Sequence, residues 1–402
     1  MARKKIYLSS GFFLLGFGLL FFASPYFFKP IEYNINDIVS GEGNEDNLKD
    51  KNVGDIKEEE IVVPFVATHL DIPEAVKGVY MTACVAGTPS IRSKMVKLVE
   101  ETELNTIIID IKDYSGTISF RVGDPLLDGF DGPGCHVSDM REFVDSLHKK
   151  GIYVVGRITV FQDPYYSKLY PELAVKKESD KSILWKDRKG IIYIDPGAKE
   201  MWDYIVMLSR GSYEAGFDEI NFDYIRFPSD GNMDDMYYPF SEEKILADMS
   251  FGKAKVLRDF FAYLDDNLKD TGAVLSADLF GMTTTNKDDL NIGQILEYAE
   301  PYFDFIAPMV YPSHYPKGFM GYDNVNTHPY EIVKFSMDEA SKRLIVATST
   351  PLKLRPWLQD NDYPVHYTPE MVRAQKQAVY DAGLTSWMLW DAANTYTREA
   401  LD

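Results

Sequence analysis

The sequence predicts an α/β protein, a (β/α)8 TIM barrel preceded by an N-terminal transmembrane or signal segment and a linker. Short apolar runs rich in β-branched residues alternate with helical patterns, which is typical of a parallel sheet covered by helices. Eight such runs fall within about 325 residues, the number that this kind of barrel requires. No G-x-G-x-x-G motif follows the first run, which disfavours the alternative, a doubly wound open sheet.

The first 29 residues have the features of an export segment. Three cations lie within residues 1–5, and residues 6–28 contain no formal charge. A stretch of 23 residues can span a bilayer, and the cations before it favour a cytoplasmic N-terminus. A cleaved signal peptide is the alternative, because Phe22-Ala23-Ser24 weakly resembles a cleavage site. We therefore expect residues 1–29 to be a membrane anchor or signal segment, with the rest of the chain outside the cytoplasm or secreted.

Residues 30–61 are expected to form a flexible acidic linker. Between positions 32 and 60 the sequence has ten acids, three bases and few large apolar side chains. Such a composition cannot bury enough apolar surface to offset the entropy of folding. Organised sequence resumes near Val62, so the barrel domain is expected over residues 62–402.

Charge and cysteine content exclude several classes of function. Asp and Glu number 62 against 42 Lys and Arg, which gives a net charge of −20. A surface of that sign repels phosphate backbones, so nucleic acid is not an expected partner. The two cysteines, Cys84 and Cys135, are expected to be unpaired, with Cys84 on an apolar strand in the core. Because no CxxC motif or His/Cys cluster is present, we expect no metal ion and no cofactor.

The expected strands are the apolar runs, each with β-branched or aromatic residues over five to nine positions. In chain order they span residues 78–83, 106–112, 153–160, 219–227, 274–279, 305–311, 344–349 and 387–391. Helical patterns between them are expected over residues 91–101, 138–149, 196–215, 242–267, 329–342 and 369–382. Lys150-Gly151 and Ala382-Gly383 each supply the glycine that commonly ends a helix.

In such barrels the reacting groups lie at the carboxyl ends of the strands and in the loops that follow. Those positions carry acids, hydrogen-bonding side chains and aromatic residues, a combination typical of carbohydrate sites. The candidate substrate-binding residues are Asp110, Lys112, Asp113, Arg157, Arg226, Tyr311, His314, Trp357, Gln359, Trp390 and Asp391. Some of these charges could equally form structural ion pairs, Asp223 with Arg226 among them.

Asp223 and Asp278 are the candidate catalytic pair, because glycoside cleavage needs two carboxyl groups flanking the bond. Asp223 follows an apolar strand, and Arg226 three residues later would help to keep it ionised as nucleophile or stabiliser. Asp278 lies among apolar residues that would raise its pKa, as a general acid requires. The two side chains are expected within about 5–10 Å of each other. Asp110 and Asp113 are the reserve candidates.

Seven segments resemble one bacterial family. They are TIIIDIKDYSG, GRITVFQDP, GFDEINFDYIRFP, SADLFGMTTTNKDDLNIGQ, DFIAPMVYPSHY, LRPWLQD and SWMLWDAANTYT. In order, over about residues 77–397, they resemble the glycoside hydrolase-like domains formerly catalogued as a domain of unknown function, within the TIM-barrel glycosidase superfamily. The resemblance implies a barrel fold and a glycosidase activity.

The segment FDEINFDYIRFP is similar, more distantly, to strand four of the α-amylase-like and exopolysaccharide-hydrolase barrels. This similarity implies that Asp223 acts on the anomeric carbon. Amylase-like enzymes usually take their acid from a Glu after strand five, whereas this sequence offers Asp278 there. A second departure is Asp391, where the family's WMLW-N segment has Asn. A carboxylate at that place would alter the charge preference for substrate or simply be solvated.

The leading hypothesis is a glycoside hydrolase that cleaves O-glycosidic bonds of a cell-surface or extracellular polysaccharide, with the membrane as a partner of the N-terminal segment. The alternative is a non-catalytic carbohydrate-binding or cell-envelope scaffold protein on a degenerate barrel, because one fold hosts many functions. A third hypothesis is another reaction on the same barrel, for instance on an amino sugar. Two carboxyl groups facing one cleft, one with a raised pKa, would favour the hydrolase over the scaffold.

Overall fold

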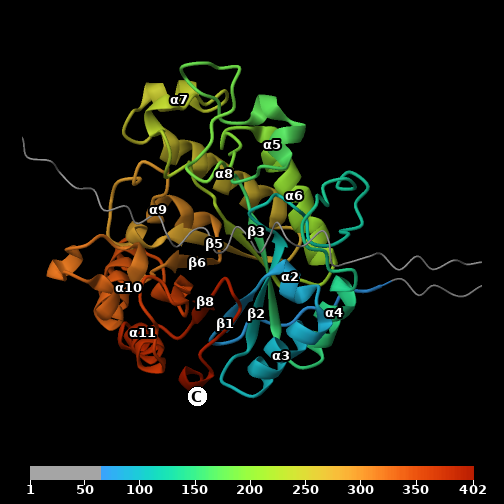
Figure 1. Cartoon of the computed structure of the whole chain (residues 1–402), viewed down its shortest axis with the longest axis vertical. Coiled ribbons are helices and arrows are strands. Elements are labelled where there is room, and N and C mark those ends of the chain that lie inside the picture. Colours follow the sequence, from blue (N-terminus) through green and yellow to red (C-terminus); the bar gives the residue numbers. More distant parts are fainter. Residues whose placement is uncertain (1–64) are drawn as a thin grey trace, which may run out of the picture. The chain divides into compact units, whose positions relative to one another are not determined.

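The computed structural model describes residues 65–402, which form a closed barrel of eight parallel strands (Figure 1). The strands are β1 (Lys77–Met81), β2 (Thr106–Lys112), β3 (Tyr153–Thr159), β4 (Glu219–Asp223), β5 (Val274–Phe280), β6 (Phe305–Met309), β7 (Trp357–Gln359) and β8 (Trp387–Trp390). Their order in the barrel follows the chain, and β1 pairs with both β2 and β8, which closes the sheet. The predicted (β/α)8 TIM barrel is therefore confirmed.

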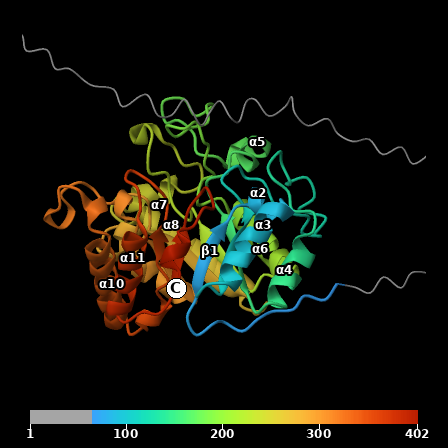
Figure 2. The ribbon, with the colours of Figure 1, turned by 60° about the horizontal axis from the view of Figure 1, so that its bottom comes forward.

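Helices surround this barrel, as Figures 1 and 2 show from two directions. They are α2 (Ala83–Ala86), α3 (Pro89–Glu100), α4 (Met140–His148), α5 (Tyr166–Leu169), α6 (Lys199–Glu214), α7 (Glu242–Ala247), α8 (Gly252–Leu268), α9 (Leu296–Ala299), α10 (Pro329–Val346) and α11 (Pro369–Asp381). The expected anchor or signal segment and the acidic linker lie outside the described residues. Within residues 65–402, no helix combines the length and the apolar character that crossing a membrane would require.

The strands are apolar along their whole length because both of their faces are covered. Every residue of β2 and of β3 is buried, as expected for parallel strands between a filled interior and a layer of helices. Ile107, Ile109 and Ile111 of β2 belong to the large apolar core, which also takes in Val144 and Leu147 of α4. Burial of these branched side chains is what holds the helices against the barrel.

Glycine ends two of the predicted helices where the sequence places it. Gly151, after α4, has φ of 72°, and Gly383, after α11, has φ of 78°. Both values lie in the left-handed region, which a residue with a Cβ adopts at a cost. Each glycine donates its backbone N–H to a carbonyl in the last turn of the helix before it, Gly151 to that of His148 and Gly383 to that of Tyr380. These helix ends are confirmed.

The predicted seventh strand, residues 344–349, is wrong. Its first three residues form the last turn of α10, in which Leu344 is buried while Ile345 and Val346 are exposed. The true strand, β7, is only three residues long, and a single residue pair joins it to β6. A strand of three residues is too short to show a recognisable pattern of apolar residues in the sequence. The apolar residues at the end of α10, taken by themselves, have the composition of a strand.

The predicted helix over residues 242–267 is two helices, α7 and α8, which are separated by residues 248–251. Asp248 ends the first helix and its Oδ1 accepts the backbone N–H groups of Ser250 and Phe251, each at 3.1 Å. An aspartate that bonds the backbone of the following residues favours a turn over a continuing helix. The helical pattern continues across this break, which is why the sequence predicts one helix.

The two cysteines form a disulfide, so the prediction that they are unpaired is wrong. Cys84 and Cys135 are 51 residues apart in sequence with their Cα atoms 4.9 Å apart. Cys84 lies at an exposed position of α2, after the first strand and outside the core. The bond joins α2 to the long loop that follows β2. Nothing in the sequence spacing of two distant cysteines reveals that the fold brings them together.

Loss of this disulfide is expected to lower the free energy of unfolding by about 2–4 kcal/mol, because the bond restricts the unfolded chain. The comparison is between the wild type and Cys84→Ser, by urea denaturation with and without a reductant. The reductant should destabilise only the wild type and bring it to the level of the variant. Equal stability of the oxidised wild type and the variant would contradict this expectation.

The floor of the barrel interior is closed by a buried ion pair. Glu219, at the start of β4, accepts hydrogen bonds from Arg355 Nη1 at 2.6 Å and from the hydroxyl of Tyr153 at 3.2 Å. Each of these three residues is at most 2% exposed, and the Arg355 guanidinium stacks on the ring of Phe305. Residues two and four positions after Glu219 face the same interior, so β4 carries polar groups from the floor up to Asp223 at its carboxyl end.

Candidate active site

A cavity of about 720 Å³ lies at the carboxyl ends of the strands. Its walls come from six of the barrel strands, β3 to β8, and from the loops that follow them, and they combine charged, aromatic and apolar side chains. The lining residues are Arg157, Asp223, Tyr224, Arg226, Ser229, Met233, Asp278, Phe280, Met282, Leu290, Asn291, Ile292, Met309, Tyr311, His314, Trp357 and Trp390. Both candidate catalytic carboxyl groups and six of the candidate substrate-binding residues line it.

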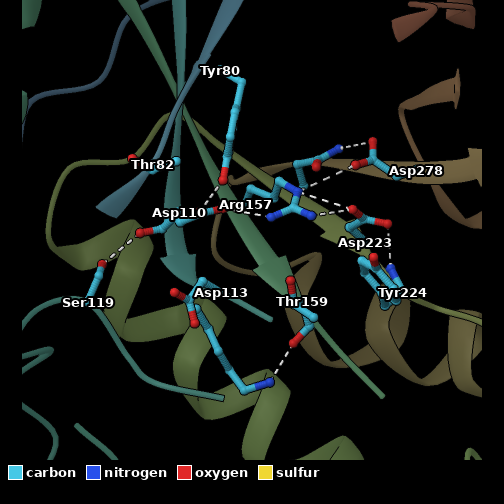
Figure 3. Close-up of polar contacts among 12 residues, drawn as sticks. Tyr80, Thr82, Asp110, Asp113, Ser119, Arg157, Thr159, Asp223, Tyr224 and Asp278 are labelled. Atoms are coloured by element: carbon cyan, nitrogen blue, oxygen red, sulfur yellow. Dashed lines mark hydrogen bonds and ion pairs between the residues drawn. The ribbon is translucent and has the colours of Figure 1, made fainter. Parts of the chain in front are cut away.

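Arg157, on β3, is the centre of the charged groups in this cavity (Figure 3). Its Nη1 donates to Asp110 at 2.7 Å, and its Nη2 and Nε both donate to Oδ2 of Asp223. Its Nε also lies 4.0 Å from Oδ2 of Asp278. Burial disfavours the charged guanidinium, but these carboxylates raise the pKa of Arg157 well above its usual value. One buried cation therefore fixes the positions of three carboxyl groups.

Asp223 is held by Arg157 and not by Arg226, which corrects the sequence-based expectation. Besides the two Arg157 contacts, its Oδ1 accepts the backbone N–H of Tyr224 at 2.6 Å. Tyr224 has φ of 53°, so the chain turns sharply where β4 ends and the next side chains leave the alternation of the strand. Arg226 lies beyond this turn, and no carboxylate among residues 65–402 is within 4.0 Å of its guanidinium.

Asp278, on β5, is buried and carries its hydrogen bonds on one oxygen. Its Oδ1 accepts from Nδ2 of Asn221 at 2.9 Å and from Nε1 of Trp357 at 2.8 Å. Burial, and then the nearby charge of Asp223, raise the pKa of Asp278 well above its usual value. This shift favours the protonated form of the group, as a general acid requires. Because Oδ1 already has two donors, the proton belongs on Oδ2, the oxygen nearer Arg157.

The two carboxyl groups lie close together. Oδ2 of Asp223 and Oδ2 of Asp278 are 3.2 and 4.0 Å from the same Nε atom of Arg157, so these oxygens are at most about 7.2 Å apart. This separation agrees with the proximity expected from two neighbouring barrel strands. It also explains why the charge of Asp223 acts so strongly on Asp278.

Aromatic rings form the other wall of the cavity. Trp390 packs edge-on against Trp357, with ring centres 5.7 Å apart, and stacks on Tyr80 at 4.2 Å. The guanidinium of Arg157 lies over the rings of both Trp390 and Tyr80. Tyr311 is buried beside the carboxyl groups, and burial together with the charges of Asp278 and Asp223 raises its pKa well above its usual value. Tyr311 is therefore a hydroxyl donor at any ordinary pH.

Asp110 lies behind the cavity wall and acts on it only through Arg157. Its Oδ1 accepts from Arg157, and its Oδ2 accepts from the hydroxyl of Tyr80 at 2.5 Å. Burial raises the pKa of Asp110 to about 6, although Arg157 and Tyr80 both favour its charged form. Asp110 is thus a candidate positioning residue, because its side chain does not line the cavity.

Lys112 and Asp113, at the end of β2, also lie away from the cavity. Lys112 forms a fully buried ion pair with Asp163 at 2.8 Å. Asp113 bonds the turn that follows it, since its Oδ1 accepts the backbone N–H of Ser115 at 2.8 Å. Both side chains are used to shape the loops above β2 and β3, which is the structural alternative that the sequence left open.

Gln359 and Asp391 have structural roles as well. The Gln359 side chain is fully buried and donates to the backbone carbonyl of Asn361 at 3.1 Å. Asp391 accepts the backbone N–H groups of Ala393 at 3.0 Å and of Thr395 at 2.7 Å, so its carboxylate closes a turn after β8. The departure from Asn at this position therefore does not add a charge to the cavity wall.

Several residues of the site are absent from the sequence-based candidates. Asn221 and Phe280 could have been found from the alternation of strands, because each is two positions from a candidate carboxyl group and so faces the same side. Tyr80 depends on the register of β1 with β2, which pairs it with Ile108 and so puts it on the same face as Asp110. Leu290 and Asn291 come from the loop after β5.

One wall of the cavity holds three residues other than glycine in the left-handed conformation. They are Tyr224, Leu290 and Asn291, with φ of 53°, 52° and 57°. Such conformations are unfavourable for residues with a Cβ and persist where the surrounding structure enforces them.

Within residues 65–402, no group of three His, Cys, Asp or Glu side chains is arranged to hold a metal ion.

Comparisons with known proteins agree with the barrel fold. No curated protein matches the chain. Among solved structures, the glycoside hydrolase domain of PgaB (BpsB) from Bordetella bronchiseptica matches over 81% of this chain and 98% of its own, at 15% identity and a TM-score of 0.58. The catalytic domain of β-amylase from Paenibacillus polymyxa matches over 81% and 94%, at 10% identity and a TM-score of 0.52. At these identities, the two structures share the barrel fold with this chain.

A hypothetical protein from Ruminiclostridium thermocellum is more similar in sequence. It is 32% identical, over 50% of this chain and 96% of its own, with a TM-score of 0.43. The profile of one family, described as "Putative glycosyl hydrolase domain", matches residues 78–396. This match includes all eight strands apart from the first residue of β1, together with every residue that lines the cavity. The chain therefore belongs to this family of glycosyl hydrolase domains.

Proposed function

We propose that the chain is a glycoside hydrolase that cleaves O-glycosidic bonds of a polysaccharide through Asp223 and Asp278. The observation that carries this proposal is a pair of carboxyl groups next to one guanidinium on the wall of one cavity. One of them, Asp223, is in a direct ion pair, and the other has a pKa raised by burial and by its neighbour. Unequal environments of this kind separate the two roles that glycoside hydrolysis needs.

In the proposed reaction, Asp278 gives its proton to the glycosidic oxygen as the bond from that oxygen to the anomeric carbon breaks. The bonding electrons leave with the oxygen, and Asp223 attacks or stabilises the positive anomeric carbon. Water then adds its hydroxyl group to this carbon, displacing the Asp223 carboxylate where it has formed a bond, and gives its other proton to Asp278. Arg157 keeps both carboxyl groups in place, and Tyr311 offers a hydroxyl donor beside them.

The same features weigh against a non-catalytic scaffold. A binding site for sugars needs aromatic rings and hydrogen-bonding groups, which Trp357, Trp390 and Tyr311 would supply. It does not need a second, buried carboxyl group with a raised pKa, which is costly to keep in a folded protein. The scaffold hypothesis leaves Asp278 without a purpose, whereas hydrolysis requires it.

We also propose that the barrel acts outside the cytoplasm, on a cell-surface or extracellular polysaccharide. The disulfide between Cys84 and Cys135 supports this location, because such bonds persist in oxidising compartments and are rare in the cytosol. The charge-free stretch over residues 6–28 supports it independently, as an anchor or a signal. Either arrangement gives the barrel access to envelope glycans.

The test is hydrolysis by the full chain across a panel of oligosaccharides that differ in sugar, linkage and charge. New reducing ends are measured, and the products are identified by mass. Release of reducing ends from at least one member of the panel supports the proposal. Binding of oligosaccharides without release of reducing ends from any of them would favour the scaffold.

A further inference from the structure

Arg226 is a cation on the cavity wall that has no carboxylate partner. Its Nη1 donates one hydrogen bond, at 3.1 Å, to the backbone carbonyl of Phe227. The part of the chain that the structure describes places no carboxylate within 4.0 Å of this guanidinium. Acids exceed bases by 20 in this protein, so a shortage of carboxylates is not the reason.

The guanidinium is held in place by aromatic packing. Its central carbon lies 4.9 Å from the ring centre of Tyr224 and 6.0 Å from that of Tyr193. The left-handed conformation of Tyr224 turns the chain at the end of β4 and so sets where Arg226 begins. A guanidinium positioned in this way keeps most of its five N–H donors available and loses little freedom when it binds a ligand.

Asp187 is an acidic residue whose charge acts on Tyr193 and Tyr224, the two rings that pack on Arg226. However, its Oδ1 accepts the backbone N–H groups of Lys189 and Ile191, both at 2.8 Å. Asp187 therefore stabilises its own turn and forms no ion pair with the guanidinium of Arg226.

The other charged groups that line the cavity have partners or favour their neutral form. Asp223 is paired with Arg157, which also binds Asp110 behind the wall, and burial raises the pKa of Asp278 and so favours its protonated form. His314 also lines the cavity, and burial, followed by the charge of Arg226, lowers its pKa, so its ring is neutral at pH 7. Among the lining residues, Arg226 is therefore the charged side chain without a partner of opposite charge, and it lies beside a neutral imidazole that can act as a further hydrogen-bond donor.

We infer that Arg226 is a subsite for an anionic group on the sugar, so that the substrate is an acidic glycan carrying a carboxylate, sulfate or phosphate. This inference rests on the proposed function for the identity of the ligand as a sugar. A guanidinium matches the two oxygens of such groups with two parallel hydrogen bonds, and a neutral hydroxyl uses only part of that fork. In a cavity that excludes part of the water, this pairing is stronger than on an open surface.

The experiment measures binding, so that it does not depend on turnover. Dissociation constants are determined by NMR titration of the full chain with the methyl glycosides of glucuronic and galacturonic acid and with their uncharged methyl esters. Glucose 6-sulfate and glucose 6-phosphate are compared with glucose in the same way. We expect at least one anion to bind about tenfold more tightly than its neutral counterpart, which is the effect of one charged hydrogen-bonded pair.

Variants test whether Arg226 is responsible. In Arg226→Gln the preference for the anion should fall to less than about twofold, and Arg226→Lys should keep part of it, because the charge remains without the fork. Arg258→Gln is the matched control. Arg258 also packs on a tyrosine, 5.2 Å from the ring centre of Tyr298, but it lies on α8 outside the cavity. Its loss should leave the preference intact.

The results separate this inference from the proposed function. Equal binding of all anions and their neutral counterparts by the wild type would overturn the inference, as would a preference that survives in Arg226→Gln. Hydrolysis restricted to neutral glycans would leave the proposed function standing and remove the acidic substrate. Selective binding of an anion without hydrolysis of any glycan would support the role of Arg226 and contradict the proposed hydrolase function. If the sulfate or phosphate is preferred over the uronic acids, the anionic group is an ester.

Discussion

Asp223→Asn is expected to abolish hydrolysis, with a loss of at least about 10³-fold in kcat, because the amide can neither attack nor stabilise a positive anomeric carbon. The substitution keeps the shape of the side chain and one carbonyl oxygen. It also leaves Arg157 paired with Asp110, at 2.7 Å, so the guanidinium keeps a carboxylate partner. The measurement is the initial rate of reducing-end release from whichever oligosaccharide the wild type cleaves.

The control for this prediction is Asp266→Asn. Asp266 is an exposed residue of α8 whose ion pair with Lys269 lies on the surface, where such pairs contribute little. The rate of Asp266→Asn should equal that of the wild type. Thermal unfolding and sugar binding are measured for both variants, so that a loss of folding is not mistaken for a loss of chemistry. A folded Asp223→Asn with more than a tenth of the wild-type rate would rule out the assigned role.

Asp278→Asn is expected to lower kcat by about 10²–10⁴-fold on natural glycosides, because the leaving oxygen loses its proton donor. The loss should be much smaller on 4-nitrophenyl glycosides, whose leaving group departs without a proton. The pH profile gives a second readout. Since only the protonated Asp278 acts as the acid, the wild-type rate should fall as pH rises through its raised pKa. That alkaline decline should be missing in the variant.

Asp195→Asn is the matched control for Asp278. Asp195 is also buried and has a pKa raised by burial, but it bonds Ser241 and backbone groups away from the cavity. Its replacement should change the stability of the protein and leave the alkaline limb of the wild-type profile in place. If the limb persists unchanged in Asp278→Asn, another group is the acid.

The sequence predicts the barrel well because the evidence for it is local and repeated. Runs such as Thr106–Lys112 are apolar along their length, and glycines such as Gly151 mark helix ends. Both signals come from burial and backbone geometry within a few residues. β7 is not predicted because its three residues are too few to show an apolar pattern. This strand is defined mainly by its pairing with β8.

The candidate site is predicted in its parts but not in its connections. Asp223 and Asp278 follow from their strands, since carboxyl ends of neighbouring strands meet at one face. The pairing of Asp223 with Arg157 depends on the register of β3 with β4, which pairs Arg157 with Asn221, two positions before Asp223, whereas sequence proximity suggests Arg226. The disulfide and the contact of Tyr80 with Asp110 likewise join positions that are far apart in sequence and that the pairing of β1 with β2 brings together.

The buried ion pair at the barrel floor bears on how products leave. Arg355, Glu219 and Tyr153 fill the interior below the cavity, so no sugar can pass through the barrel. In the proposed reaction, each released fragment would therefore leave by the same mouth through which the glycan enters. Fragments that stay stacked on the aromatic rings there would delay the next glycan, and release of product would then limit turnover at high glycan concentration.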